Sequence, residues 1–213
     1  ACAPYRRVHL CHHNLETIDT KSTTSDNAKH NLLLEVCMAA KYEGDSIKTH
    51  YTPYQATYGD SDSQICTMLA RSFADIGDIV RGKDLYLGND KEKEKRDELE
   101  SKLKEIFGKI HEGLKNGKAK ERYKDNDKKN FYRLREDWWY ANRAKVWYAI
   151  TCGAGESDKY FRRTCGDVKD PSVAKDHCRC DGKKTGKNET DQVPTNFDYV
   201  PQYLRWFEEW AER

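Results

Sequence analysis

The residues with the clearest chemical potential form a cluster of cations in the second half of the chain. Nine basic and three acidic residues lie between Lys115 and Arg135, although the whole chain has a net charge of only +2. Cations at this density bind polyanions through charge-assisted hydrogen bonds and the release of counterions. The alternative is a solvated connector whose charges bind nothing. We predict a polyanion site, called here the basic segment, that comprises Lys115, Lys118, Lys120, Arg122, Lys124, Lys128, Lys129 and Arg133.

Cysteines are the second group of chemically capable residues. The chain has eight of them, and none lies between Cys66 and Cys152. An even number of cysteines in a polar chain is typical of a disulfide framework, and therefore of a protein outside the reducing cytoplasm. The sequence leaves the pairing open. We expect the disulfides to form among Cys2, Cys11, Cys37, Cys66, Cys152, Cys165, Cys178 and Cys180.

This compartment narrows the choice of polyanion. Nucleic acid is disfavoured because intracellular compartments reduce disulfides, so a sulfated glycosaminoglycan or another glycan outside the cell fits better. Two dibasic pairs, Arg6 with Arg7 and Arg162 with Arg163, are further candidates for the same surface. Each pair lies close to a cysteine, so a structural role is the alternative reading.

Other chemistry finds little support in the sequence. His177, Cys178 and Cys180 are adjacent, but a structural zinc site usually has two paired cysteine knuckles, and a second knuckle is lacking. The chain contains no nucleophile elbow, phosphate loop or complete dinucleotide fingerprint. We therefore predict a protein that is not an enzyme and that holds neither a metal nor a cofactor.

The elements that position these residues are predicted to be helices. We expect a short helix over Asn31–Lys41 and a loop over Gly44–Gly59. An amphipathic helix is predicted next, because apolar residues recur at steps of three and four. Asp62 is placed to cap its start. This stripe, which we assign to the core, consists of Ile65, Leu69, Phe73, Ile76 and Val80.

Three further helices follow along the chain. Six basic and six acidic residues alternate between Lys91 and Glu105, which predicts a solvated helix with mutually satisfied charges. Its apolar stripe consists of Leu99, Leu103, Ile106, Ile110 and Leu114. A third long helix contains Trp138, Trp139 and Trp147, which we expect to anchor the fold. Pro201 begins the last helix, in which Tyr203, Leu204, Phe207 and Trp210 share one face.

These elements predict an all-α fold, a disulfide-stapled helical bundle with long irregular loops. We expect a loop-rich, disulfide-tethered first subdomain over residues 1–60 and a helical-bundle second subdomain over residues 61–213. No run of 18 apolar residues occurs, so we predict no membrane insertion by this chain. A secreted-type cysteine pattern without a signal peptide suggests a domain excised from a larger exported protein. Asn188 begins a glycosylation motif in a polar loop.

Four long segments go beyond these physical patterns. They are ACAPYRRVHLC at 1–11, LARSFADIGDIVRGKDLYLGN at 69–89, YFRRTC at 160–165 and FDYVPQYLRWFEEWAER at 197–213. Together they resemble the Duffy-binding-like domain of alpha type, which heads the erythrocyte membrane protein 1 adhesins of Plasmodium falciparum. In that family a third helical subdomain normally follows the LRWFEEW motif, so the resemblance implies that this chain lacks it.

The resemblance also implies a function. It predicts an adhesion domain on the extracellular face of the infected red cell, within a larger membrane-anchored protein that host antibodies recognise. Alpha-type domains are implicated in rosetting, with heparan sulfate-like glycans, blood-group sugars or complement receptor 1 as the host ligand. No family motif selects among these ligands, so the basic segment rests on charge alone. Binding of a protein receptor through an apolar or aromatic patch is the alternative.

Overall fold

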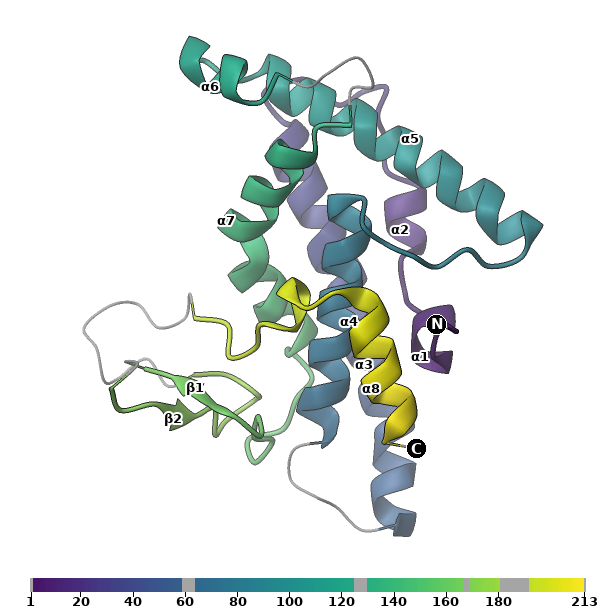
Figure 1. Ribbon diagram of the computed structural model, residues 1–213, viewed down its shortest axis with the longest axis vertical. Coiled ribbons are helices and arrows are strands. Elements are labelled where there is room, and N and C mark those ends of the chain that lie inside the picture. Colours follow the sequence, from purple (N-terminus) through teal and green to yellow (C-terminus); the bar gives the residue numbers. More distant parts are fainter. Residues whose placement is uncertain (1, 59–63, 125–129, 167–168, 181–191, 213) are drawn as a thin grey trace.

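Three long helices form the centre of the molecule. The computed structural model describes residues 2–58, 64–124, 130–166, 169–180 and 192–212. Within it, α3 (Ala28–Tyr58), α4 (Gln64–Arg81) and α7 (Tyr132–Ile150) pack against one another as a bundle (Figure 1). α5 (Asp90–Glu112) crosses one end of this bundle, where it contacts both α3 and α7.

Aromatic rings fill the space between these helices. Trp139 lies against Phe73, with 5.1 Å between ring centroids, and Trp147 meets the same ring edge-on at 5.3 Å. Trp138 packs edge-on against Phe107 of α5 at 6.1 Å. All three tryptophans are buried, as predicted. These ring pairs join α7 to α4 and to α5. Each pair contributes about 0.5–1.5 kcal/mol to stability beyond its buried area.

The predicted loop over Gly44–Gly59 is wrong, because α3 continues without a break from Ala28 to Tyr58. The predicted loop began at Gly44. In the structure this glycine is a point of close approach between α3 and α7, since a Cβ added there would lie 2.0 Å from the carbonyl oxygen of Ile150. A glycine in a helix interior costs about 1 kcal/mol, and here it permits the helix contact.

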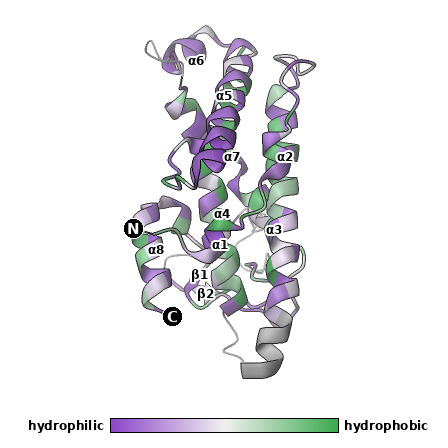
Figure 2. Cartoon of the chain, turned by 90° about the vertical axis from the view of Figure 1, so that its right-hand side faces the viewer, coloured by the Kyte–Doolittle hydropathy of each residue, from purple (hydrophilic) through white to green (hydrophobic). Residues whose placement is uncertain are grey.

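The amphipathic stripe of α4 is confirmed, and all five of its predicted residues are buried. α5 is largely polar in its hydropathy colouring (Figure 2), and its four stripe residues within the helix are buried while most of its charged residues are exposed. Its start carries a signal that the sequence reading missed. Asn89 accepts a hydrogen bond from the backbone of Glu92, which returns one to the Asn89 backbone, and this capping box satisfies two otherwise unpaired donors.

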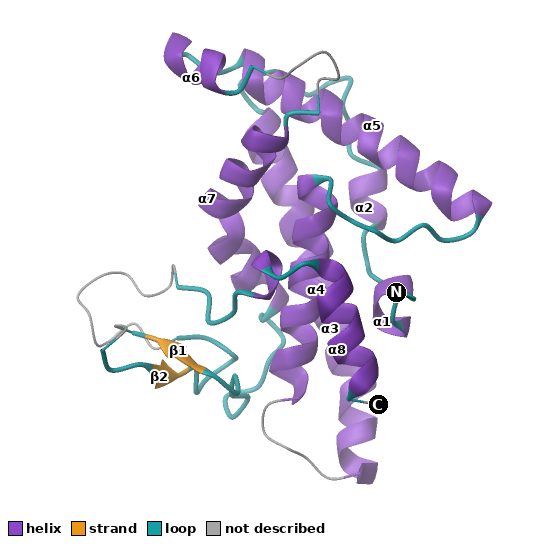
Figure 3. Cartoon of the chain, in the orientation of Figure 1, coloured by secondary structure: helices purple, strands orange, loops and turns teal. Residues whose placement is uncertain are grey.

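The remaining elements are short (Figure 3). Near the N-terminus lie α1 (Tyr5–Val8) and α2 (His13–Glu16), and α6 (Gly117–Arg122) connects α5 to α7. The strands β1 (Arg163–Cys165) and β2 (Ser172–Val173) form a small antiparallel pair. The chain then passes through a 3-10 turn, η2 (Phe197–Tyr199), into α8 (Gln202–Ala211). The predicted all-α, disulfide-stapled fold class is therefore confirmed.

A buried layer of charges holds α1 and α8 against α4. Asp75 of α4 pairs with Arg6 at 2.7 Å and with Arg205 at 2.8 Å, and its side chain is fully buried. Arg6 also pairs with Glu209 of α8 at 2.9 Å, and Arg205 with Asp78 of α4 at 2.5 Å. Burial alone would raise the pKa of Asp75, but Arg6 and Arg205 outweigh burial and lower it.

Two disulfides form, Cys66–Cys178 and Cys165–Cys180. The expectation that all eight cysteines pair is not met, because four of them carry free thiols, namely Cys2, Cys11, Cys37 and Cys152. The expected disulfide tether of the N-terminal segment is likewise absent from the described part of the chain. Buried arginines fasten that segment instead, since Arg7 forms a second inward ion pair, with Asp84.

Candidate functional site

The basic segment lies at one end of the bundle, where α6 projects beyond α5 and α7 (Figure 1). The Asn116 side chain begins α6 by accepting a hydrogen bond from the Lys118 backbone at 2.9 Å. His111 of α5 contacts the Lys120 carbonyl oxygen at 2.8 Å and fixes the short helix in place. The local sequence thus builds a small platform that presents its lysines to solvent, and Lys115, Lys118, Lys120 and Lys124 are all exposed.

The cations of this platform differ in how far they are neutralised. Arg122 pairs with Asp137 of α7 at 3.1 Å, and Lys124 pairs with Glu121 at 3.5 Å. Across the residues that the structure describes, no carboxylate lies within ion-pair distance of Lys115, Lys118 or Lys120. These three lysines therefore supply most of the uncompensated charge.

Helical geometry places the cations of α6 on two different sides of the helix. Lys118 and Arg122 are four residues apart on α6 and share one side of it, whereas Lys120 points to the opposite side. Arg133 joins the Arg122 side, because its Nη1 donates to the Arg122 carbonyl oxygen at 3.4 Å. This contact brings the cation at the start of α7 next to the end of α6. Lys128 and Lys129 lie outside the described residues.

Arg135, counted as basic when the segment was found, does not belong to its surface. The side chain is fully buried, pairs with Glu100 at 3.0 Å and lies over the Phe107 ring at 5.3 Å. Its position in α7, one residue after buried Leu134, places it on the inward side. A net charge counted along a sequence window cannot make this distinction.

The two dibasic pairs also differ in burial. Arg6 and Arg7 are buried and paired with carboxylates, so they have a structural role. Arg162 and Arg163 are exposed, and Arg162 lies over the Phe161 ring at 5.0 Å. Only the second pair is accessible to a ligand.

α8 buries its polar side and exposes its apolar side, the reverse of the usual amphipathic helix. Its buried side contains Arg205, Trp206 and Glu209, which join the charged layer on α4, and its apolar side faces solvent. Phe207 is the most exposed of these apolar residues, at 71%. The sequence predicted that the apolar residues of α8 share one face, but it did not predict that this face is exposed. The exposed apolar side of α8 consists of Tyr203, Leu204, Phe207 and Trp210.

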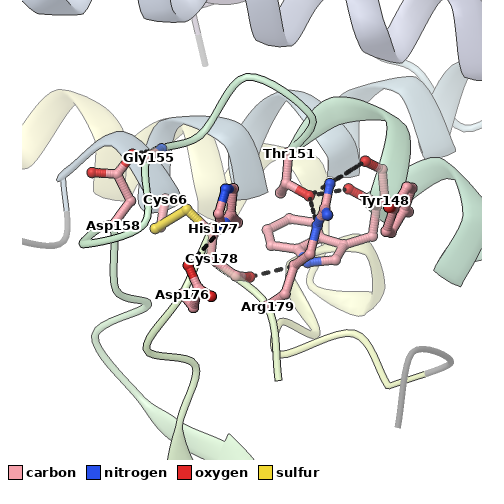
Figure 4. The surroundings of a disulfide bond; sticks show 10 residues. Cys66, Tyr148, Thr151, Gly155, Asp158, Asp176, His177, Cys178 and Arg179 are labelled. Carbon is pink, nitrogen blue, oxygen red and sulfur yellow. Dashed lines mark hydrogen bonds and ion pairs between the residues drawn. A yellow bond between two sulfur atoms is a disulfide. The ribbon is translucent and has the colours of Figure 1, made fainter. Parts of the chain in front are cut away.

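At the other end of α7, the Cys66–Cys178 disulfide ties the start of α4 to a tight loop (Figure 4). Trp147 donates to the Cys178 carbonyl oxygen at 3.2 Å. Beside it, the Arg179 guanidinium lies over the Tyr148 ring, 3.7 Å from its centroid. The sulfurs of Cys178 and Cys180 are both in disulfides, so neither is available as a zinc ligand.

The described residues contain no group of three side chains suited to hold a metal ion. In the same part of the chain, no helix combines the length and apolarity that crossing a bilayer requires. Burial and the neighbouring Glu43 carboxylate raise the pKa of the Cys11 thiol to about 11, which keeps it protonated and unreactive near neutral pH.

Comparison with known proteins identifies the family. Residues 1–205 match the model of the Duffy binding domain. The chain belongs to the Duffy binding domain family. No match was found among curated proteins.

Solved Duffy binding domains resemble the chain over its whole length. The NTS-DBL1(alpha-1) domain of the Plasmodium falciparum membrane protein 1 (PfEMP1) of the varO strain is 42% identical with a TM-score of 0.78; the match covers 100% of this chain and 43% of that one. The PfEMP1 IT4var13 DBLbeta domain bound to ICAM-1 is 33% identical with a TM-score of 0.70, covering 99% of this chain and 44% of that one. The chain thus spans less than half the length of these relatives. The alpha type is supported, as the sequence predicted.

Proposed function

We propose that this domain is a non-enzymatic adhesion module that binds a host red-cell glycan through the basic segment. The preferred ligands are heparan sulfate-like chains, with blood-group sugars as the other glycan class. The observation that carries the proposal is the exposed trio Lys115, Lys118 and Lys120, for which the described residues offer no carboxylate partner. Uncompensated cations on a protruding platform attract a polyanion over several ångströms.

The relatives support an adhesive role. A PfEMP1 DBLbeta domain has been solved bound to ICAM-1, and the alpha-type domains come from the same membrane protein. We propose that this domain lies on the extracellular face of the infected red cell, within a longer membrane-anchored protein and open to host antibodies. The two disulfides of the domain fit an oxidising exterior better than a compartment that contains nucleic acid.

The test exchanges charge at matched sites. The variant Lys115→Glu/Lys118→Glu/Lys120→Glu reverses three charges on the platform, and Lys91→Glu/Lys93→Glu/Lys95→Glu reverses three exposed charges at the start of α5. Because counterion release dominates polyanion binding, the platform variant should elute from heparin at much lower salt than wild type. The α5 variant should elute near wild type. Equal losses in both variants would show that only net charge matters and would refute the site.

A second function is favoured by the exposed apolar side of α8. A protein receptor, such as complement receptor 1, would bury Tyr203, Leu204 and Phe207 at the centre of an interface, where aromatic residues contribute most of the affinity. Such binding would depend only weakly on salt. Receptor binding that Phe207→Ser abolishes and the platform variant leaves intact would favour this function over the first.

The division into a first subdomain over residues 1–60 and a second over residues 61–213 remains a proposal. The boundary falls between α3 and α4, which pack against each other. Limited proteolysis that cuts first near residue 60 and releases a folded C-terminal fragment would support it.

A further inference from the structure

The outward face of α7 carries a row of exposed residues that the fold does not explain. The buried residues of α7 together occupy about 220° of its circumference, which leaves the remaining side toward solvent; they are Leu134, Arg135, Trp138, Trp139, Val146, Trp147 and Ile150. At about 100° per residue, the helix brings Arg133, Tyr140 and Tyr148 into an arc of about 80°. Tyr140 is 74% exposed and Tyr148 is 55% exposed. Two large rings held in water on one helix face contribute little to stability.

The upper end of this row joins the basic segment. Arg133 contacts the Arg122 carbonyl oxygen of α6, as described above. Asp137 lies on the same face, but it accepts hydrogen bonds from Arg122 at 3.1 Å and from the Tyr123 hydroxyl at 2.6 Å. Its negative charge is therefore already engaged, and the hydrogen bond raises the pKa of Tyr123. A polyanion that binds α6 meets no free carboxylate from Asp137 as it passes onto α7.

The lower end of the row is held by the disulfide loop (Figure 4). The Arg179 Nε donates to the Thr151 hydroxyl at 2.7 Å, and its Nη2 donates to the Tyr148 carbonyl oxygen at 2.8 Å. These bonds hold the guanidinium over the Tyr148 ring without neutralising it. Lys145 is also exposed, but it lies about 140° around the helix from Tyr140, outside the row. Among the described residues, no carboxylate lies within ion-pair distance of Arg133 or Arg179.

We propose that this face, called the α7 track (Arg133, Tyr140, Tyr148 and Arg179), binds a linear sulfated glycan in an extended conformation. The inference rests on the proposed function and extends it from a cationic platform to a track of defined length. The cations bind sulfates and carboxylates along the chain, and the tyrosine rings stack against the apolar faces of successive sugar rings. The track runs along α7 from Arg133 to Tyr148, so it is about 22 Å long at 1.5 Å per residue.

Length dependence distinguishes a track from a point-like cluster of charge. Heparin fragments of increasing length should bind wild type with rising affinity until the fragment spans both the platform and the α7 track. In Tyr140→Ala/Tyr148→Ala the short fragments should bind as in wild type. The long fragments should lose about tenfold in affinity, since two aromatic contacts contribute together about 1.4 kcal/mol. Both rings are exposed, so circular dichroism should show an unchanged fold.

Matched controls separate the two proposals. Tyr203→Ala/Phe207→Ala removes two exposed rings from α8 and should leave every fragment bound as in wild type. If the platform variant loses binding and the Tyr140→Ala/Tyr148→Ala variant keeps its length dependence, the α7 track is wrong and the proposed function stands. If neither variant changes heparin binding, both proposals fail. Tighter binding of single-stranded nucleic acid than of heparin, by stacking on the same tyrosines, would also overturn the track.

Discussion

The two disulfides close loops of very different length, and this difference predicts different contributions to stability. Cys66–Cys178 joins residues 112 apart in sequence, whereas Cys165–Cys180 joins residues 15 apart. A disulfide stabilises a fold mainly because it removes conformational freedom from the unfolded chain, and it removes more when the loop is longer. Breaking the long-range bond should therefore be the more costly change.

The chain-entropy relation gives the magnitudes. A loop of 15 residues corresponds to about 3 kcal/mol and one of 112 residues to about 4.8 kcal/mol at 25 °C. The expected gap between the two double variants, Cys66→Ala/Cys178→Ala and Cys165→Ala/Cys180→Ala, is then about 1.8 kcal/mol. Cys66 and Cys178 are both completely buried, so the loss of sulfur packing adds to the larger value.

Urea unfolding measures both variants. The exposed thiols of Cys2 and Cys152 would attack the remaining disulfide during unfolding, so the comparison belongs in a Cys2→Ser/Cys152→Ser background. The free energy of unfolding should fall more for the long-range variant, with a larger urea m-value in both because the unfolded chain expands. An equal or larger loss for the short loop would refute the entropic reasoning and indicate that local packing of the loop dominates.

Two further predictions concern buried ionisable groups. Asp75→Asn should lower the free energy of unfolding by about 3 kcal/mol, because it leaves two buried arginines short of a partner. The pKa of Asp75 lies below its ordinary 3.8 in the folded state, so its stabilisation is complete above that value and is lost as pH falls through the folded pKa. Urea titrations at pH 6 and below about pH 3 should therefore show the gap between variant and wild type narrowing in acid. In the second prediction, iodoacetamide at neutral pH should alkylate exposed Cys152 well before Cys11, because the pKa of the Cys11 thiol is about 11. Peptide mass mapping measures the order of alkylation. Alkylation of Cys11 first would contradict the argument from burial.

Periodicity predicted the elements in which burial follows hydrophobicity. The α4 stripe and the three tryptophans of α7 lie where apolar spacing placed them, because core packing and local sequence agree there. The α3 boundary failed because the role of Gly44 depends on Ile150, a residue more than a hundred positions away. Local sequence carries no record of such an approach.

The candidate site was predictable only in part. The exposed lysines of the basic segment were found from charge density, but the count that located it included buried Arg135, because counting ignores which side of a helix a residue occupies. α8 reversed the usual rule, since Arg205 and Glu209 find buried partners on α4 and α1 that no local pattern reveals. The exposed tyrosines of α7 were also missed, although their spacing from the buried tryptophans was a usable signal.

The charged layer under α8 has a practical consequence for the domain as an adhesive. Buried ion pairs are shielded from dissolved ions, whereas exposed cations are screened beyond about 10 Å at 0.1 M salt. The same type of interaction therefore serves two purposes with opposite sensitivity to the medium. Ionic strength should release a polyanionic ligand while the attachment of α8 through Asp75 and Arg205 persists. The domain should thus bind and release its ligand repeatedly as ionic strength changes, without unfolding.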